Sequence, residues 1–377
     1  MKQGWEIKKL GEVCEITMGQ SPSSNTYNDS EGLPFYQGNG DFGKVNPIAR
    51  VYCNAPIRIA ECNDILISVR APIGAINIAN CKCCIGRGLA SIRSTKSLSY
   101  EFVYHALIAN KEKLIAQGTG STFKSIGRSI LKELPIPVPP LPIQERIVSE
   151  LDLLNGIIEK KREQLKELDA LAQSIFYDMF GDPITNEKGW EVKKLGEEFN
   201  ISSGGTPDTK ITHYWDGGNI SWIGSNMCQN EIIYNNDGKY ITDLGLSNSS
   251  AKVYQEGYVL VALVGATIGK TALLRFPTAT NQNVAGINVP QNSEYTSEFI
   301  FCLIRNLYEL FVSIGSGKFK MANLSFIRSL PLLSPPLPLQ HQFASKIEAI
   351  ERQKELIKQS ISETETLFNA RMQHYFN

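Results

Sequence analysis

Three groups of residues in the sequence are of types that could carry out chemistry, and the first is a cysteine cluster. Five of the eight cysteines crowd one region: Cys53, Cys62, Cys81, Cys83 and Cys84. Cys81 and Cys84 form a C-x-x-C pair of the kind that binds zinc, but no second pair follows at zinc-ribbon spacing, and His105 is the only histidine nearby. The favoured interpretation is small, reduced, buried hydrophobic side chains, and zinc ligation is the alternative.

The second group is the segment GATIGKT at 265–271, which resembles a phosphate-binding loop. It has three residues between Gly265 and Gly269, whereas the nucleotide-binding motif needs four. The third group, the four histidines, is scattered: His105, His213, His341 and His374. No Ser-His-Asp or Cys-His arrangement follows from them, no glycine-rich dinucleotide fingerprint follows a strand, and the segment at 46–49 (NPIA) lacks the N-P-P-aromatic signature of an adenine methyltransferase. These patterns favour a chain without catalytic residues of its own.

The amino-acid composition indicates which class of protein this is. With 42% hydrophobic and 20% charged residues the chain can bury real cores, which excludes a disordered protein. No apolar run approaches the roughly 18 residues that cross a membrane, and the first residues do not resemble a signal peptide. We therefore expect a cytoplasmic protein. The 38 basic and 38 acidic residues cancel, so net charge by itself indicates neither a nucleic acid nor a membrane partner.

An internal repeat organises the chain. GWEIKKLGE at 4–12 returns as GWEVKKLGE at 189–197, and LPIPVPPLPIQ at 134–144 returns as LPLLSPPLPLQ at 330–340. The offset grows from 185 to 196, so the second copy carries about 11 extra residues. The sequence is therefore a tandem duplication.

Each copy has a globular part followed by a helical part. Short β-branched runs such as DILISV (64–69) and YVLVALV (258–264) alternate with turns, which predicts mixed α/β globules. Each Pro-rich stretch is followed by some 38 residues without a further proline, as expected for a long helix of roughly 57 Å. The predicted fold class is α+β, with four segments: globules at 1–140 and 181–338, and long helices at 141–180 and 339–377.

Apolar residues of the two predicted helices recur at alternating spacings of three and four, which indicates a coiled-coil seam. The seam residues are Ile147, Leu151, Leu154, Ile158, Leu165, Leu168, Phe343, Ile347, Ile350, Ile357 and Ile361. Lys161, Lys354 and Thr364 interrupt the pattern. Repeated units in one chain favour a pseudo-two-fold arrangement, so we expect the helices to pair antiparallel.

The paired GWE[IV]KKLGE segments, the PPLP[IL]Q entry to each helix and the repeated globule resemble the DNA specificity subunit of type I restriction-modification systems, over essentially the whole length. The resemblance implies that each globule is a target recognition domain that reads one half of a split, asymmetric DNA sequence, that the helices set the gap, and that the subunit is non-catalytic. It also implies partners: two methyltransferase subunits that use S-adenosylmethionine and, for cleavage, two restriction subunits that use ATP and Mg²⁺. This chain itself is expected to bind no cofactor and no metal.

The net charge differs between segments, although the whole chain is neutral. Residues 1–140 hold 16 basic and 11 acidic side chains, a net charge of +5, whereas 181–338 hold 12 and 14, a net charge of −2. Because phosphate contacts supply much of the affinity for DNA, the second globule needs a local basic patch or help from partner subunits.

Amides and arginines in loops are the candidates for reading bases, because Asn and Gln suit adenine and Arg suits guanine. In the first globule they are Gln20, Gln37, Asn39, Arg70 and Arg87, with Thr119, Ser121 and Lys124 in a loop suited to backbone contacts. In the second they are Ser225, Asn226, Lys270, Gln282 and Asn283, with Lys318 and Lys320 in the corresponding backbone loop.

Acidic residues on the outer faces of the helices suit either docking of partners or simple solvation: Glu159, Glu163, Glu167, Glu351, Glu355 and Glu363. Two alternatives to restriction stay open. One is the specificity subunit of a methylation-only or other defence assembly. The other is a coiled-coil assembly protein that does not bind DNA.

Overall fold

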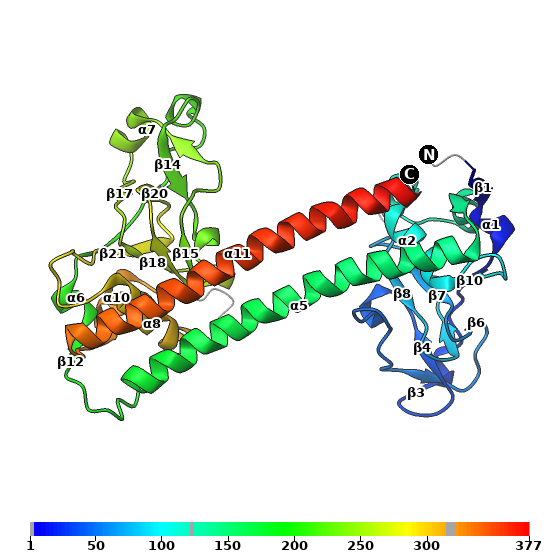
Figure 1. Cartoon of the computed structure of the whole chain (residues 1–377), viewed down its shortest axis with the longest axis horizontal. Helices are drawn as coiled ribbons and strands as arrows, with labels where there is room; N and C mark the ends of the chain where they lie inside the picture. The colour runs from blue at the N-terminus through cyan, green and yellow to red at the C-terminus, as the bar shows by residue number, and fades with distance from the viewer. Residues whose placement is uncertain (1–3, 121–123, 314–320, 377) are drawn as a thin grey trace. The chain divides into compact units, whose positions relative to one another are not determined.

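The computed structural model describes residues 4–120, 124–313 and 321–376 (Figure 1). The chain forms two compact units. Unit 1 comprises residues 1–161 together with 360–377, and unit 2 comprises 162–359. Each unit contains one mixed α/β globule and a part of both long helices. The predicted fold class, a repeated mixture of helices and sheets, is confirmed.

The two long helices are α5 (Leu141–Phe180) and α11 (Leu337–Phe376). In unit 1, the first part of α5 shares a core with the last part of α11, through Ile147 and Tyr375. In unit 2, the last part of α5 shares a core with the first part of α11, through Phe176 and Phe343. The helices therefore run antiparallel in each unit, as predicted. In the described part of the chain, none of the helices combines the length and apolar character that crossing a membrane requires.

The described residues of unit 1 form three sheets. Their strand orders are β1-β11, β2-β10-β7-β8 and β3-β5-β4-β9-β6. The strands are β1 (Glu6–Lys9), β2 (Cys14–Met18), β3 (Tyr27–Asn28), β4 (Leu33–Tyr36), β5 (Tyr52–Cys53), β6 (Ile59–Ala60), β7 (Ile65–Ser68), β8 (Ile76–Ile78), β9 (Cys83–Ile85), β10 (Leu89–Ser94) and β11 (Pro135–Val138). The shorter helices are α1 (Leu10–Val13), η1 (Ser24–Thr26), η2 (Asn39–Asp41), α2 (Tyr100–Ala109), α3 (Lys111–Ala116) and α4 (Arg128–Glu133). Strands β2, β7 and β10, helix α2 and the two long helices supply the main core.

Unit 2 repeats this plan. Its strand orders are β12-β22, β13-β21-β18-β19-β15 and β16-β14-β20-β17. The strands are β12 (Val192–Lys194), β13 (Ile201–Ser203), β14 (Ile220–Ile223), β15 (Glu231–Ile233), β16 (Tyr240–Ile241), β17 (Val253–Tyr254), β18 (Val259–Ala262), β19 (Thr271–Leu274), β20 (Thr278–Thr280), β21 (Val284–Ile287) and β22 (Pro331–Leu333). The shorter helices are α6 (Leu195–Glu198), η3 (Thr212–Tyr214), η4 (Ser225–Met227), α7 (Asp243–Ser247), η5 (Gly265–Thr267), α8 (Ser297–Asn306), α9 (Tyr308–Val312) and α10 (Leu324–Ser329).

The repeated GWE[IV]KKLGE segment forms a strand that runs directly into a one-turn helix. The second glycine of the segment permits close packing of that helix. A Cβ on Gly11 would lie 2.7 Å from Cγ of Lys132 in α4, and a Cβ on Gly196 would lie 2.5 Å from Cβ of Arg328 in α10. Both approaches are closer than carbon atoms tolerate. Glycine at these two equivalent positions therefore lets α1 and α6 lie directly against α4 and α10.

The glutamine that ends each PPLP[IL]Q motif is fully buried. It joins the long helix to the start of α2 in unit 1 and to the start of α8 in unit 2. Gln144 Oε1 accepts from Ser99 N at 2.9 Å, and its Nε2 donates to the carbonyls of Ser97 and Pro139, both at 2.8 Å. Gln340 makes the same three contacts with Thr296 N, Glu294 O and Pro335 O, at 3.0, 3.0 and 2.9 Å. One side chain thus satisfies three backbone groups at the same point of both repeats.

Replacing this glutamine with leucine should destabilise the unit that contains it. In Gln144→Leu the isobutyl group cannot pair with Ser99 N or Pro139 O, so we expect the free energy of unfolding to fall by about 2 to 3 kcal/mol. Urea unfolding followed by hydrogen exchange measures the change and assigns it to unit 1. Glu145→Ala, at the exposed neighbouring position, is the matched control. An unchanged midpoint in Gln144→Leu would contradict the assigned role.

Candidate nucleic-acid interface

Three loops of unit 1 meet at one edge because of how their strands pair. β4 and β9 are parallel neighbours, so the loops that follow them leave the sheet at the same edge. β10 returns from the second of these loops and pairs antiparallel with β7, which brings the end of β7 to the same place. The first loop carries Gln37 and Asn39, the second carries Arg87, and the loop after β7 carries Arg70.

Glycine allows the loops to lie against each other. Arg87 is flanked by Gly86 and Gly88, and a Cβ on Gly88 would lie 2.2 Å from the carbonyl oxygen of Gln37. Gly86 N donates to Tyr36 O at 2.8 Å. The Arg87 side chain is therefore presented by a turn that is fixed at both of its flanking residues.

The loop after β4 is also fixed. Oδ2 of Asp41 accepts from the backbone nitrogens of Gln37 and Gly38, at 2.6 and 3.3 Å, and so closes the turn that contains Asn39. The loops enclose a hollow of about 250 Å³. Its lining residues are Ser21, Gln37, Gly38, Asn39, Arg70, Ala71, Arg87 and Gly88.

Four of the five first-globule candidates thus line one hollow, and the fifth, Gln20, lies beside it. Gln20 N donates to Ile85 O, the residue that precedes the Gly86-Arg87-Gly88 turn. Thr119 pairs through its backbone with Ser125, which also bridges to Arg70, so the exposed side chains of Thr119 and Lys124 belong to the neighbouring loop. Ser121 lies outside the described residues, as do Lys318 and Lys320.

Unit 2 builds the same edge with different side chains. β14 and β20 are parallel neighbours, and Asn281 N donates to Ile223 O at 3.1 Å, as Gly86 does to Tyr36 in unit 1. The loop after β20 reads Asn281-Gln282-Asn283 where unit 1 has Gly86-Arg87-Gly88. Leu263 N donates to Asn283 O at 2.8 Å, the contact that Val69 makes with Gly88 at 2.9 Å. The backbone of the edge is repeated while its side chains have diverged.

Amides gather at this second edge. A Cβ on Gly224 would lie 2.6 Å from Oδ1 of Asn226 and 3.5 Å from Nδ2 of Asn281, which places these two side chains together. Thr206 Oγ1 donates to Gln282 Oε1 at 2.6 Å. Ser225 and Asn226 begin η4 as Asn39 begins η2.

Lys270 lies in a separate hollow. Its Nζ donates to Gln229 Oε1 at 2.7 Å. This hollow of about 400 Å³ is lined by Ala172, Gln173, Asn230, Lys270, Cys302, Arg305, Asn306 and Tyr308. Lys270 is followed by strand β19, whereas a nucleotide-binding loop opens a helix. The GATIGKT segment is therefore a turn between two strands.

The cysteines of unit 1 divide by burial. Cys53, Cys83 and Cys84 are buried in two small apolar clusters, as the packing interpretation expects, whereas Cys62 is exposed and Cys81 half-buried. Burial raises the pKa of the Cys83 and Cys84 thiols, which keeps them protonated. Within the described ranges, residues 4–120, 124–313 and 321–376, no three His, Cys, Asp or Glu side chains are grouped to hold a metal ion.

The repeated architecture coincides with a known family. The model of the type I restriction modification DNA specificity domain matches residues 2–169 and again residues 187–366. The chain belongs to this family. The resemblance noted in the sequence is thereby confirmed.

Some relatives in this family match about half of this chain, and others match most of its length. The putative type I restriction enzyme MjaX specificity subunit of Methanocaldococcus jannaschii is 41% identical over 177 residues, 46% of this chain and 42% of that protein. The MjaIX specificity subunit of the same organism is 25% identical, over 92% of this chain and 86% of that protein. The S subunit of a type I system from M. genitalium has the same fold, with a TM-score of 0.60 at 15% identity, over 99% of this chain and 96% of that one.

The predicted seam residues lie along the helix pair, with burial that varies along it. Eight of the predicted residues are buried: Ile147, Leu151, Leu154, Ile158, Phe343, Ile347, Ile350 and Ile361. Leu165, Leu168 and Ile357 are half-buried. The predicted seam leaves out Phe176 and Phe180, whose rings pack on the seam residue Phe343 in unit 2 with ring centroids 5.7 and 5.1 Å away.

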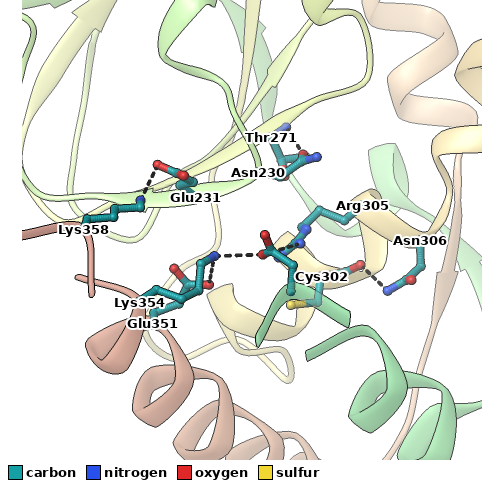
Figure 2. Close-up of polar contacts among 10 residues, drawn as sticks. Asn230, Glu231, Thr271, Cys302, Arg305, Asn306, Glu351, Lys354 and Lys358 are labelled. Atoms are coloured by element: carbon teal, nitrogen blue, oxygen red, sulfur yellow. Dashed lines mark hydrogen bonds and ion pairs between the residues drawn. The ribbon is translucent and has the colours of Figure 1, made fainter. Parts of the chain in front are cut away.

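Lys354, a polar interruption of the seam, is buried in an ion cluster within unit 2 (Figure 2). Its Nζ lies 2.9 Å from Asp169 Oδ1 of α5 and 2.8 Å from Glu351 Oε1 on its own helix. Arg305 of α8 reaches the same Asp169 oxygen at 3.5 Å. Burial alone would lower the pKa of Lys354, but the Glu351 and Asp169 carboxylates outweigh burial and raise it above 10.5. Lys354 is therefore charged where α5, α8 and α11 meet.

This cluster corrects one prediction. Glu351 is not part of an outward docking face, because only 5% of it is exposed and it pairs with Lys354. The helical period alone places it outside the apolar stripe, but it cannot show that a lysine at a seam position draws its carboxylate inward. Glu159 also has a partner within its unit, since it pairs with Lys44.

Sequence reasoning missed several residues that shape the interface or the framework behind it. Asp41 closes the turn at Gln37, and Asn281 adds an amide to the second edge. Gln144 and Gln340 were visible as the repeated last letter of PPLP[IL]Q, which was a usable signal for a shared structural role. Asp41 left no comparable signal, because an Asp within a Gly-rich loop is common in turns of every kind.

Proposed function

We propose that this chain is the non-catalytic DNA specificity subunit of a type I restriction-modification complex in a prokaryotic cytoplasm. Unit 1 and unit 2 each read one half of an asymmetric, bipartite duplex target, and the length of the long helices sets the permitted gap. The chain docks two methyltransferase subunits and, for cleavage, two restriction subunits. S-adenosylmethionine, ATP and Mg²⁺ are bound by those partners.

The repeated loop edge is the observation that carries this proposal. Two frameworks with the same backbone contacts present different polar side chains, Arg87 in one and Gln282 in the other. Reading bases requires hydrogen-bonding groups held on a fixed scaffold, and reading two unlike half-sites requires two such scaffolds with unlike side chains. The domain boundaries at 140, 180 and 338 and the DNA contacts of the individual loop residues are part of the same proposal.

Genome-wide mapping of N6-methyladenine tests it. In cells that carry this chain and its partner methyltransferase, we expect a methylated split motif with a fixed gap, lost when this chain is deleted and restored when it is supplied again. Methylation that is unchanged by the deletion would overturn the proposal. The parent strain without the methyltransferase controls for methylation from other enzymes.

A further inference from the structure

The two loop edges differ in kind as well as in sequence. In unit 1 the turn after β9 carries an arginine between two glycines, and a second arginine, Arg70, lines the same hollow. In unit 2 the turn after β20 carries three consecutive amide side chains, 281–283. One edge therefore offers cationic donors, and the other offers groups that both donate and accept.

Arg70 and Arg87, the two arginines that line the hollow of unit 1, are both exposed. Within the part of the chain that the structure describes, neither the Arg70 nor the Arg87 guanidinium forms an ion pair or a side-chain hydrogen bond. By contrast, Arg93 of the same unit is held by Asp64, with contacts of 2.8 and 2.9 Å. The bonds at Arg70 and Arg87 are made by their backbones, so the turns are fixed while the guanidinium groups stay free.

The chemistry of these groups selects a base. Arginine pairs with O6 and N7 of guanine through two parallel N–H donors, whereas both major-groove positions of adenine cannot be satisfied by donors alone. The Gln37 and Asn39 amides on the rim suit adenine or provide a second contact.

The second edge offers the kind of group that pairs with adenine. The Gln282 carbonyl accepts from Thr206 Oγ1, which orients the side-chain amide while its Nε2 hydrogens and a second lone pair of Oε1 remain available. That pair of groups matches N7 and N6 of adenine. Arg275, the arginine next along the chain before this turn, is paired with Glu298 and Glu348.

We propose that Arg87 and Arg70 read guanine in the half-site bound by unit 1, and that Gln282 reads adenine in the half-site bound by unit 2. This assignment rests on the proposed function. It makes the two halves of the target chemically unequal, with a guanine contact from this loop edge on the unit 1 side alone.

Methyl transfer to duplex oligonucleotides by the complex with the partner methyltransferase tests the assignment. In Arg87→Ala we expect discrimination at one G·C pair to fall by about 5- to 150-fold, the range that one bidentate arginine contact supplies. The other half-site should be read as before. In Gln282→Ala the loss should appear at one A·T pair of the other half-site. Arg128→Ala removes the same charge at an exposed position of unit 1 outside the hollow and should leave both half-sites unchanged.

The outcomes separate this assignment from the proposed function. If Arg87→Ala weakens binding to every sequence equally, with discrimination intact, Arg87 contacts phosphate and the assignment is overturned while the function stands. A unit 1 half-site without guanine overturns it as well. Continued methylation of relaxed targets by Arg87→Ala shows that the variant is folded. If no split motif depends on this chain at all, the proposed function fails first.

Discussion

Lys354→Ala is expected to lower the free energy of unfolding by about 3 to 5 kcal/mol, because it leaves Glu351 buried without its cationic partner. Chemical denaturation measures the change, and hydrogen exchange should place it in unit 2. Lys346→Ala is the control. Lys346 is an exposed lysine two turns earlier on the same helix, and its loss should change stability by no more than about 0.5 kcal/mol. Equal effects of the two substitutions would contradict the role of the ion cluster.

Removing both buried charges should give the opposite result. The variant Lys354→Met with Glu351→Leu leaves no buried unpaired ion, and Asp169 stays half-exposed beside Arg305, so we expect stability close to or above that of the original chain. The pH dependence should differ too. Because the pKa of folded Lys354 lies above its ordinary 10.5, its contribution is complete below that pH and is lost as the pH rises through the folded value. The double variant should lack this alkaline loss.

Met372→Ala with Phe376→Ala is expected to destabilise unit 1 by at least about 5 kcal/mol, although both residues lie more than 200 positions from most of that unit. Both side chains are buried in the unit 1 core, where the Phe376 ring lies 5.0 Å from that of Phe102. Hydrogen exchange should show lost protection in α2 (Tyr100–Ala109). Gln373→Ala with His374→Ala alters the exposed side of the same turn and serves as the control. Retained protection of α2 in the core variant would overturn this expectation.

The long helices were predictable from sequence because one signal repeats many times along them. Proline at the entrance and apolar residues at spacings of three and four place α5 at 141–180, as observed, and α11 within two residues of its first residue. The partner of Lys354 was not predictable, because Asp169 is 185 positions away and hydrophobic periodicity says nothing about which charge faces which. The sharing of each helix between two units leaves no local signature either.

The candidate interface was predictable in residue type but not in geometry. Loop amides and arginines are recognisable by type, and Arg70, Arg87, Gln37 and Asn39 do converge on one hollow. Their convergence depends on the parallel pairing of β4 with β9, which joins strands of only four and three residues about 50 positions apart. Strands this short carry too little pattern to reveal their neighbours. Lys270 shows the limit, since its type suits DNA contact yet its side chain lies in another hollow.

The division of both long helices between the units has a consequence for synthesis. Unit 1 needs residues 360–376, which the ribosome makes only after residues 162–359. At ordinary elongation rates this delay is roughly 10 to 40 s. During that time the Ile147 and Leu151 face of α5 has no α11 to cover it. Unit 2 is contiguous in the chain and can close first, so the globule that is made first is completed last.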